Sequence, residues 1–310
     1  MRYRRLTAVA GSLLSACSTP ASDDLAKKDS SAPAAATAIE WSRVDSALGR
    51  TGTEQTGNVR RYGMPRTDLR VTAYGVTLRP AFALGSWIAF APHGTGAVAM
   101  GDLVLTEDEL APVIARLQEG GVEQTAIHHH VNHETPSIRY VHIHAHGDPV
   151  TIATTVRAAL NLTGTPDSSP SAPVTTPLGI DTTALTSTLG YSGRLNGGVW
   201  QIGIPRAETI RSGDFEIPAS MGLGTGINFQ PTGNEMAAIT GDFVLLGSEV
   251  NRVIKALSDN GITVTSLHNH LLDESPRLFF MHFWANDDAL KLARGLRAGL
   301  DATNSQRGDR

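Results

Sequence analysis

The chain has 310 residues, of which 41% are hydrophobic and 18% are charged, so it can bury the core of one large domain or two ordinary ones. Its formal net charge of −4 excludes the basic surface of a general nucleic-acid binder, and we expect no nucleic-acid partner. A single cysteine excludes an internal disulfide and any multi-cysteine zinc or iron–sulfur site. The eleven histidines are the unusual feature, because seven of them fall between His128 and His146.

The first residues have the pattern of an export signal. A basic head precedes an apolar run over 6–14, which is followed by Leu14-Ser15-Ala16-Cys17. The run is too short to span a bilayer as a helix, which needs about 20 residues. The Leu-Ser-Ala-Cys ending resembles a bacterial lipobox, and we therefore predict a lipoprotein signal peptide over 1–16 with lipidation at Cys17. The alternative is an ordinary secretory signal with an incidental cysteine.

The residues after Cys17 have the composition of a tether. Ser, Thr, Pro, Ala, Asp and Lys dominate the segment 17–39, which offers almost nothing to bury. We therefore expect an extracytoplasmic protein that is anchored to a bacterial membrane through the lipid on Cys17. A partner in the cell envelope fits this location, but the sequence does not identify one.

The rest of the chain contains one unit twice, at a constant offset of 140 residues. The matching segments are 101–105 with 241–245, 128–130 with 268–270, and 134–136 with 274–276. We interpret 40–163 as the first repeat and 178–304 as the second. The segment 164–177 is then a linker, and 305–310 is a tail.

The local pattern is the same in both repeats. In the first, it predicts a strand at 100–105, a helix that begins at Thr106, strands at 122–131 and 138–146, and a helix capped by Asp148. Short strands are expected before this unit, at 69–76 and 81–90. The order predicts an α+β fold with two homologous domains, each a β-α-β-β-α layer unit with additional short strands at its N-terminal side.

The histidines fall on the expected hairpin. Alternate residues of a strand share a face, so His128 projects with His130, and His142 projects with His144 and His146. If even positions pair with even positions, both sets share one surface. Imidazoles packed this closely repel each other when protonated and leave polar atoms unpaired when they are buried and neutral. A divalent transition metal ion removes both difficulties.

The second repeat narrows the selection of candidate ligands. His129, His133, His144 and His146 are replaced there, whereas His-x-His, a glutamate four residues later and a further histidine eight residues after it are present in both. The candidate metal ligands are therefore His128, His130, Glu134, His142, His268, His270, Glu274 and His282. Three histidines and a carboxylate in each repeat predict a mononuclear site for Zn, Mn, Fe or Cu. The alternative is that these side chains satisfy backbone carbonyls around a tight turn.

Two other recurring features have a structural interpretation. Arg66 and Arg206 are each followed by a carboxylate two residues later, a pair that more often fixes a loop than binds an anion. Asp102 and Asp242 follow a glycine close to a helix start, where a carboxylate commonly caps backbone amides.

Three segments carry a resemblance to a known family. They are 65–68 (Pro-Arg-Thr-Asp), 100–105 (Met-Gly-Asp-Leu-Val-Leu) and 267–277 (Leu-His-Asn-His-Leu-Leu-Asp-Glu-Ser-Pro-Arg). With these segments the chain resembles the LppY/LpqO family of bacterial lipoproteins. The resemblance covers nearly everything after residue 41, and it implies a tandem domain of unknown function in a lipoprotein context. It implies no established reaction.

Three functions compete on this evidence. The first is a membrane-anchored protein that binds a transition metal in two related domains. The second is a metal-dependent hydrolase, in which Glu134 or Glu274 acts as the base toward a metal-bound water. The third is an envelope scaffold or partner-binding module whose histidines are structural. Whether the protein is an enzyme stays open at this point.

Overall fold

The computed structural model describes residues 39–167 and 178–308, and all of them belong to one compact unit, Ala36–Arg310. Cys17, the predicted signal peptide and nearly all of the predicted tether lie outside the described residues, as do 168–177 of the linker and the last two residues. None of the helices in the described residues has the length and apolar character needed to cross a membrane.

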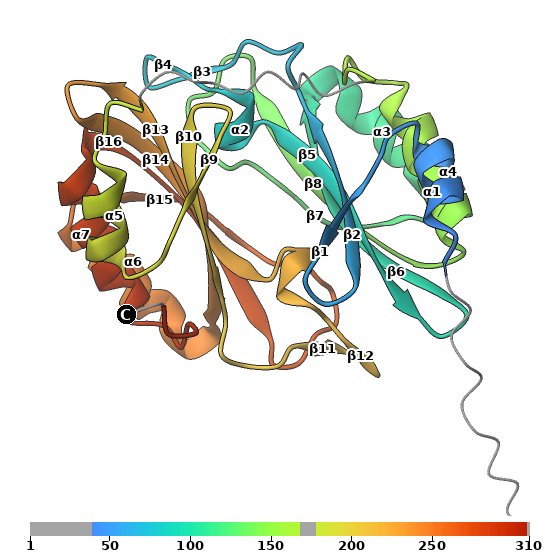
Figure 1. Ribbon diagram of the computed structural model, residues 1–310. Coiled ribbons are helices and arrows are strands. Elements are labelled where there is room, and N and C mark those ends of the chain that lie inside the picture. The colour runs from blue at the N-terminus through green and yellow to red at the C-terminus, as the bar shows by residue number, and fades with distance from the viewer. Residues whose placement is uncertain (1–38, 168–177, 309–310) are drawn as a thin grey trace, which may run out of the picture. The chain divides into compact units, whose positions relative to one another are not determined.

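The two repeats contain the same elements in the same order (Figure 1). The elements of the first repeat are α1 (Trp41–Leu48), β1 (Thr53–Gln55), β2 (Val59–Pro65), β3 (Thr72–Ala73), β4 (Val76–Thr77), α2 (Pro80–Ala83), β5 (Gly85–His93), β6 (Gly96–Thr106), α3 (Glu107–Glu119), β7 (Glu123–His128), β8 (Ile138–Gly147) and α4 (Pro149–Leu160). Those of the second are α5 (Thr182–Leu189), β9 (Arg194–Asn196), β10 (Val199–Pro205), β11 (Arg211–Ser212), β12 (Phe215–Glu216), η1 (Ala219–Met221), β13 (Gly224–Gly233), β14 (Met236–Leu246), α6 (Gly247–Asp259), β15 (Thr263–His268), β16 (Leu278–Asp288) and α7 (Ala289–Leu300).

Each repeat builds a six-stranded sheet with the same strand order. The first is ordered β1-β2-β5-β6-β8-β7, and the second is its counterpart, β9-β10-β13-β14-β16-β15. All neighbouring strands in both sheets are antiparallel. The expected α+β fold with two homologous units is confirmed, and the β-α-β-β-α pattern corresponds to the run from β6 to α4 and from β14 to α7.

The expected short strands at 69–76 and 81–90 differ from the observed elements. The first is a short hairpin, in which the strands β3 and β4 have two residues each and the turn residues Tyr74 and Gly75 both have positive φ. The second begins as the short helix α2, because Pro80 fixes a helical φ at its first position, and the strand β5 starts only at Gly85. The strand expected at 122–131 ends at His128, so His130 lies in the following loop.

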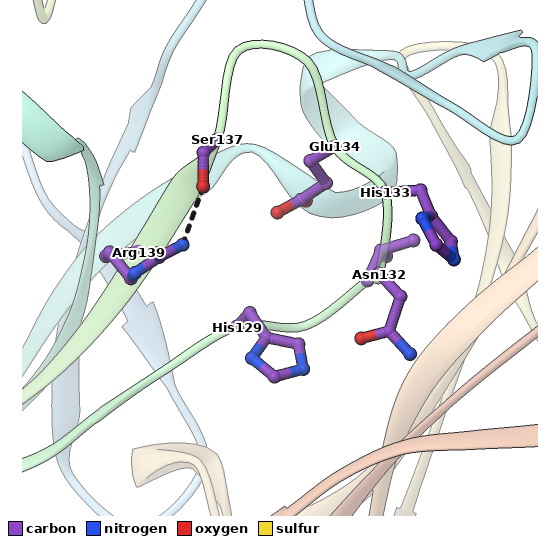
Figure 2. Close-up of a pocket in the computed structure, with 7 residues that line it drawn as sticks. His129, Asn132, His133, Glu134, Ser137 and Arg139 are labelled. Carbon is purple, nitrogen blue, oxygen red and sulfur yellow. Dashed lines mark hydrogen bonds between the residues drawn. The ribbon is translucent and has the colours of Figure 1, made fainter.

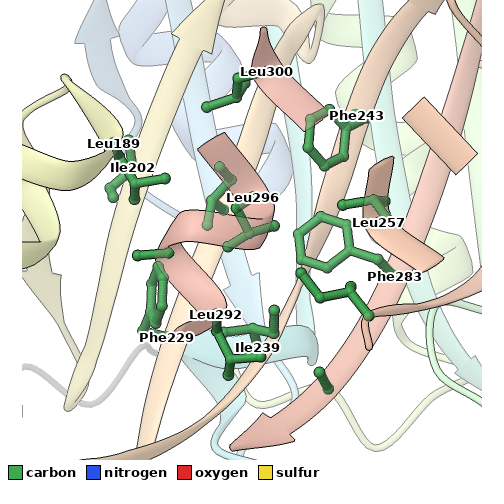
Figure 3. Close-up of a cluster of buried hydrophobic side chains, with 14 of the residues drawn as sticks. Leu189, Ile202, Phe229, Ile239, Phe243, Leu257, Phe283, Leu292, Leu296 and Leu300 are labelled. Atoms are coloured by element: carbon green, nitrogen blue, oxygen red, sulfur yellow. The ribbon is translucent and has the colours of Figure 1, made fainter. Parts of the chain in front are cut away.

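The helices of each repeat cover one face of its own sheet, as Figure 1 shows for α1, α3 and α4 and for α5, α6 and α7. In the second repeat Phe243 and Phe283 project from adjacent strands against Leu257 of α6 and Leu296 of α7 (Figure 3). These side chains are fully buried, which makes this face the apolar core of the repeat. The first repeat has an equivalent core under α3 and α4.

The opposite faces of the two sheets take part in contacts between the repeats. One apolar cluster combines Met100 and Ala91 of the first repeat with Phe280 and Leu223 of the second. Another combines residues such as Phe82 and Tyr140 of the first repeat with Trp284 of the second. Each repeat therefore has its own core under its helices and a second apolar surface that packs against the other repeat.

A buried arginine fixes the start of one helix in each repeat. Arg206 is 4% exposed; its Nη1 donates to Glu249 Oε2 at 2.7 Å and to the Val244 carbonyl at 2.7 Å. Glu249 also accepts the backbone N–H groups of Leu246 and Asn304, which lie before α6 and after α7. The pair therefore joins a strand end, a helix start and the chain that follows the last helix, and the expected structural role of this arginine is confirmed. Arg66 and Glu109 form the same arrangement.

We predict that Arg206→Ala lowers the free energy of unfolding by about 3–5 kcal/mol, because it leaves the Glu249 carboxylate buried without its partner. Urea denaturation measures the change. The control is Arg211→Ala, whose ion pair with Glu216 is exposed on both sides and should contribute less than about 1 kcal/mol. Equal losses for the two variants would contradict this role.

Candidate metal centre

Six of the predicted ligands occupy equivalent positions in the two hairpins. His128 and His268 end the strands β7 and β15, His130 and His270 follow in the loops, and His142 and His282 lie on β8 and β16. His128 pairs with Tyr140, and Ala126 pairs with His142. At this end of the hairpin even positions pair with even positions, so His128 and His142 share one face; beyond the register shift between Gln124 and Ala126, Glu123 pairs with His144.

The structure brings the two sets of histidines together into one cluster rather than two separate sites. His128 Nε2 lies 3.3 Å from His282 Nε2, although the two residues are 154 positions apart. The rings of His128 and His268 stack at 3.7 Å, and the ring of His142 lies 3.7 Å from that of His270. The sequence predicts one site in each repeat, and in the structure the histidines of both repeats meet in a single cluster.

Reciprocal hydrogen bonds hold the two loops in place. Thr125 Oγ1 donates to the His270 carbonyl at 2.6 Å, and its counterpart Thr265 donates to the His130 carbonyl at 2.6 Å. Each repeat thus fixes the backbone of the other's second histidine. Reciprocal contacts of this kind indicate a local twofold relation between the repeats.

Two aspartates complete the cluster, and this corrects their interpretation as helix caps. Asp102 lies within β6 directly opposite His142, and Asp242 lies within β14 directly opposite His282. Asp102 Oδ2 is 3.5 Å from His130 Nε2, and Asp242 Oδ2 is 3.2 Å from His270 Nε2. The signal in the sequence is the recurrence of Gly-Asp at the 140-residue offset, but only the strand register shows what these side chains face.

The glycine before each aspartate has a role of its own. The carbonyl of Gly241 accepts a hydrogen bond from His282 Nδ1 at 2.7 Å, which leaves Nε2 of that ring directed to the cluster. A Cβ at this position would overlap the carbonyl oxygen of Gly226 on the neighbouring strand. Gly101 forms the equivalent backbone bond with His142. Glycine therefore permits the close strand approach that orients the ring.

Burial sets the charge state of the cluster. Burial first, and then the neighbouring histidines, lowers the pKa of four of the rings: His128, His130, His142 and His268. Burial also lowers the pKa of His282. These five imidazoles are therefore neutral at physiological pH and have lone pairs to offer. Burial, followed by the charge of Asp242, raises the pKa of Asp102 well above its usual range.

Many of the polar atoms in the cluster are unpaired. Within the described residues, seven buried cluster atoms have no hydrogen-bond partner: His128 Nδ1, His130 Nε2, His142 Nε2, His268 Nε2, His270 Nε2, Asp102 Oδ1 and Asp242 Oδ1. Each such atom costs about 1–3 kcal/mol when it is buried without a partner. Neutral imidazole and carboxylate are the donors that a divalent transition metal binds, so a cation would satisfy them together.

Four groups of three side chains have their ligand atoms within 4.8 Å of one another, a spacing that suits a shared ion. The groups are His128, His142 and His268; His128, His130 and His282; Asp102, His130 and His142; and Asp242, His268 and His270. All of them are drawn from the six histidines and two aspartates described above.

The predicted glutamate ligands are engaged elsewhere. Glu274 accepts the backbone N–H of Leu278 at 2.9 Å and Nη1 of Arg277 at 3.2 Å. Glu134 Oε1 lies 3.4 Å from the Tyr140 hydroxyl. Neither glutamate belongs to a group that could hold an ion, and the carboxylates that do are the aspartates.

Glu134 instead lines an open pocket of about 270 Å³ beside the cluster, which Figure 2 shows with Arg139, His129 and Asn132 around it. Burial raises the pKa of Glu134 to about 8. The lining residues include none of the six histidines and two aspartates of the cluster. Some residues that line the pocket are thus neighbours in sequence of His128 and His130, but the pocket and the cluster have no residue in common.

Comparison with known proteins places this architecture in a family. The chain belongs to the family described as Domain of Unknown Function (DUF1259), which matches residues 42–162 and 183–302 and so covers both repeats. No curated protein matches the chain. A solved structure, described as the crystal structure of a trimeric bacterial microcompartment shell protein PduB, is 14% identical over 83% of this chain and 96% of its own. Its TM-score is 0.22, which supports no argument about this protein.

We predict that Gly241→Ala destabilises the protein by about 1–3 kcal/mol, because the added methyl group forces β13 and β14 apart and moves the carbonyl that holds His282. The melting temperature and urea midpoint measure this. Gly226→Ala on the paired strand is the control, since a Cβ there meets nothing within 4 Å and should be neutral. A neutral Gly241→Ala variant would contradict the proposed strand contact.

Proposed function

We propose that this protein binds divalent transition metal at a single centre that its two repeats build jointly. The supporting observation is the convergence of seven unpaired buried polar atoms, which come from five of the six histidines and from both aspartates. Such atoms are rare in native proteins, and a cluster of them suggests an ion that completes the structure. The distance of 3.3 Å between His128 Nε2 and His282 Nε2 also suits two ligands of one ion, because tetrahedral Zn–N bonds place their nitrogens roughly 3.4 Å apart.

The competing interpretation, in which the histidines are purely structural, requires their ring nitrogens to bond backbone carbonyls. The carbonyl of Gly241 does accept from His282, but this bond uses Nδ1 and leaves Nε2 facing the cluster. His142 has the same backbone partner in Gly101, and its Nε2 is unpaired. These bonds are therefore the outer support that ligating histidines have in metal sites, which favours a metal over a turn network.

The donor set limits the choice of metal. Six imidazoles favour Zn²⁺, Cu²⁺ or Fe²⁺, and the two carboxylates also permit Mn²⁺. The thiolates that select Cu⁺ are not part of the cluster. We propose Cu²⁺, Zn²⁺, Fe²⁺ or Mn²⁺ as the ion, in the order of their affinity for nitrogen ligands.

Burial favours metal binding over hydrolysis. A hydrolytic metal needs an open position for water and substrate. Here the donor atoms are buried, and the pocket that contains Glu134 is lined by other residues. The glutamates proposed as general bases do not lie among the candidate ligand groups, so a hydrolase is the weaker of the two metal-dependent functions.

The location is a separate proposal that rests on the sequence. The lipobox-like residues before Cys17 and the resemblance of the repeats to the LppY/LpqO lipoproteins support an extracytoplasmic protein that is held at a bacterial membrane by its lipid. A metal centre outside the cytoplasm would then serve metal capture or storage in the envelope. An additional proposal is that the protein binds a further partner in the cell envelope.

We predict that untagged protein, stripped of metal and titrated with Zn²⁺, Cu²⁺, Fe²⁺ or Mn²⁺, retains at least one of these ions after desalting. Bound metal should raise the melting temperature by about 5–10 °C at 100-fold excess over Kd, because binding adds about 2.7 kcal/mol to the native state. Elemental analysis and calorimetry measure both effects.

Two sets of alanine variants distinguish the histidines of the cluster from other histidines of the chain. Alanine at His128, His130, His268 and His270 should abolish binding, whereas alanine at His93, His144 and His146 should leave it intact. Retention of metal by the first variant, or failure of every one of the four ions to bind or stabilise the wild type, would refute the proposed function.

We predict that Cys17→Ser removes lipidation of the protein in a bacterial host. The wild type should incorporate labelled palmitate and partition into the detergent phase, and the variant should do neither, because the thiol that carries the acyl chain is lost. The control is Ser15→Thr, which changes a neighbouring residue and keeps Cys17, the only cysteine of the sequence. Equal partitioning of wild type and Cys17→Ser would refute the anchor.

A further inference from the structure

We propose that the centre holds two metal ions side by side, each bound by the aspartate and the His-x-His pair of one repeat and by the strand histidine of the other. One set is Asp102, His128, His130 and His282, and the other is Asp242, His268, His270 and His142. This inference rests on the proposed metal binding and adds the number of ions and the assignment of their ligands.

Two of the four ligand groups share no residue and define the two sets. His128, His130 and His282 form one group, and Asp242, His268 and His270 form another. Asp102 joins the first set through its 3.5 Å contact with His130. The 140-residue offset relates His282 to His142, which therefore completes the second set. Each set then has three imidazoles and one carboxylate, four ligands in all, as a tetrahedral ion requires.

The close polar contacts fall within the sets rather than between them. His128 Nε2 lies 3.3 Å from His282 Nε2 in the first set, and His270 Nε2 lies 3.2 Å from Asp242 Oδ2 in the second. Two further groups, one of His128, His142 and His268 and one of Asp102, His130 and His142, contain members of both sets within 4.8 Å. The two positions are therefore neighbours, as in centres where paired ions lie about 3.5–4 Å apart.

One ion would leave the cluster incomplete. Four ligands satisfy a tetrahedral ion and six an octahedral one, but eight donor side chains converge here. A single ion would leave at least two of them buried without a partner.

The first test is the number of ions in the full chain. Native mass spectrometry of the untagged protein with Zn²⁺ is expected to show two ions per chain. No ion would refute metal binding itself, whereas one ion per chain would leave the proposed function intact and overturn this inference. Replacement of Zn²⁺ by Cu²⁺ should give a spin-coupled signal in electron paramagnetic resonance, and two uncoupled Cu²⁺ signals would overturn the adjacency.

The second test is the assignment of ligands, which two double variants of equal composition distinguish. His128→Ala with His282→Ala changes one set only and should leave one ion per chain. His128→Ala with His142→Ala changes both sets and should leave none. Circular dichroism verifies that both variants are folded.

The opposite result has a clear meaning. If the pair His128→Ala and His142→Ala retains an ion and the pair His128→Ala and His282→Ala loses both, each ion is bound by a single repeat, and the crossed assignment is wrong. Loss of both ions from both folded variants would mean that the two positions are not independent and would also overturn the division into two sets.

Discussion

The burial of neutral imidazoles and carboxylates between two sheets is the constraint that organises this protein. His142 and His282 are almost fully buried, and each lies opposite an aspartate on the adjacent strand. Polar groups in such a place need partners, and those that the protein supplies are few. The cluster forms where the repeats meet, because His128 of the first repeat contacts His282 of the second, and two of the four candidate ligand groups combine residues of both repeats.

The motifs that recur in both repeats each contribute to this cluster. Gly241 allows β13 and β14 to approach closely and offers its carbonyl to His282, while Asp242 presents its carboxylate to His270. Thr265 holds the loop of the opposite repeat. Gly-Asp, the His-x-His pair and the strand histidine are therefore one functional unit, although 40 residues separate its first and last members. The hydrogen bonds of the Arg206–Glu249 pair go to backbone groups of Val244, Leu246 and Asn304, outside this unit.

The sequence predicts the local features of this arrangement well and its tertiary features poorly. Helix caps, apolar stripes and the alternation of the histidines depend on neighbouring residues, so β6 to α4 and the shared face of His128 and His142 follow from the pattern. The pairing of Asp102 with His142 depends on the register between strands that a helix and a further strand separate in sequence. Glu134 has the right residue type at a plausible spacing, but its loop directs it to Tyr140 instead.

The two repeats have the same residues in the cluster but different residues around it. All eight cluster side chains have the same identity in both copies, whereas the pocket beside them does not: His129, Asn132 and Arg139 correspond to Asn269, Leu272 and Phe279. The two glutamates differ in their partners, because Glu274 accepts a hydrogen bond from Arg277, whereas the equivalent position in the first repeat is Ser137. Burial raises the pKa of both glutamates. The lining of the pocket is therefore specific to the first repeat, whereas the side chains of the cluster are common to both repeats. The proposed metal binding is in this sense a property of the pair of repeats, and the pocket is a feature of the first repeat alone.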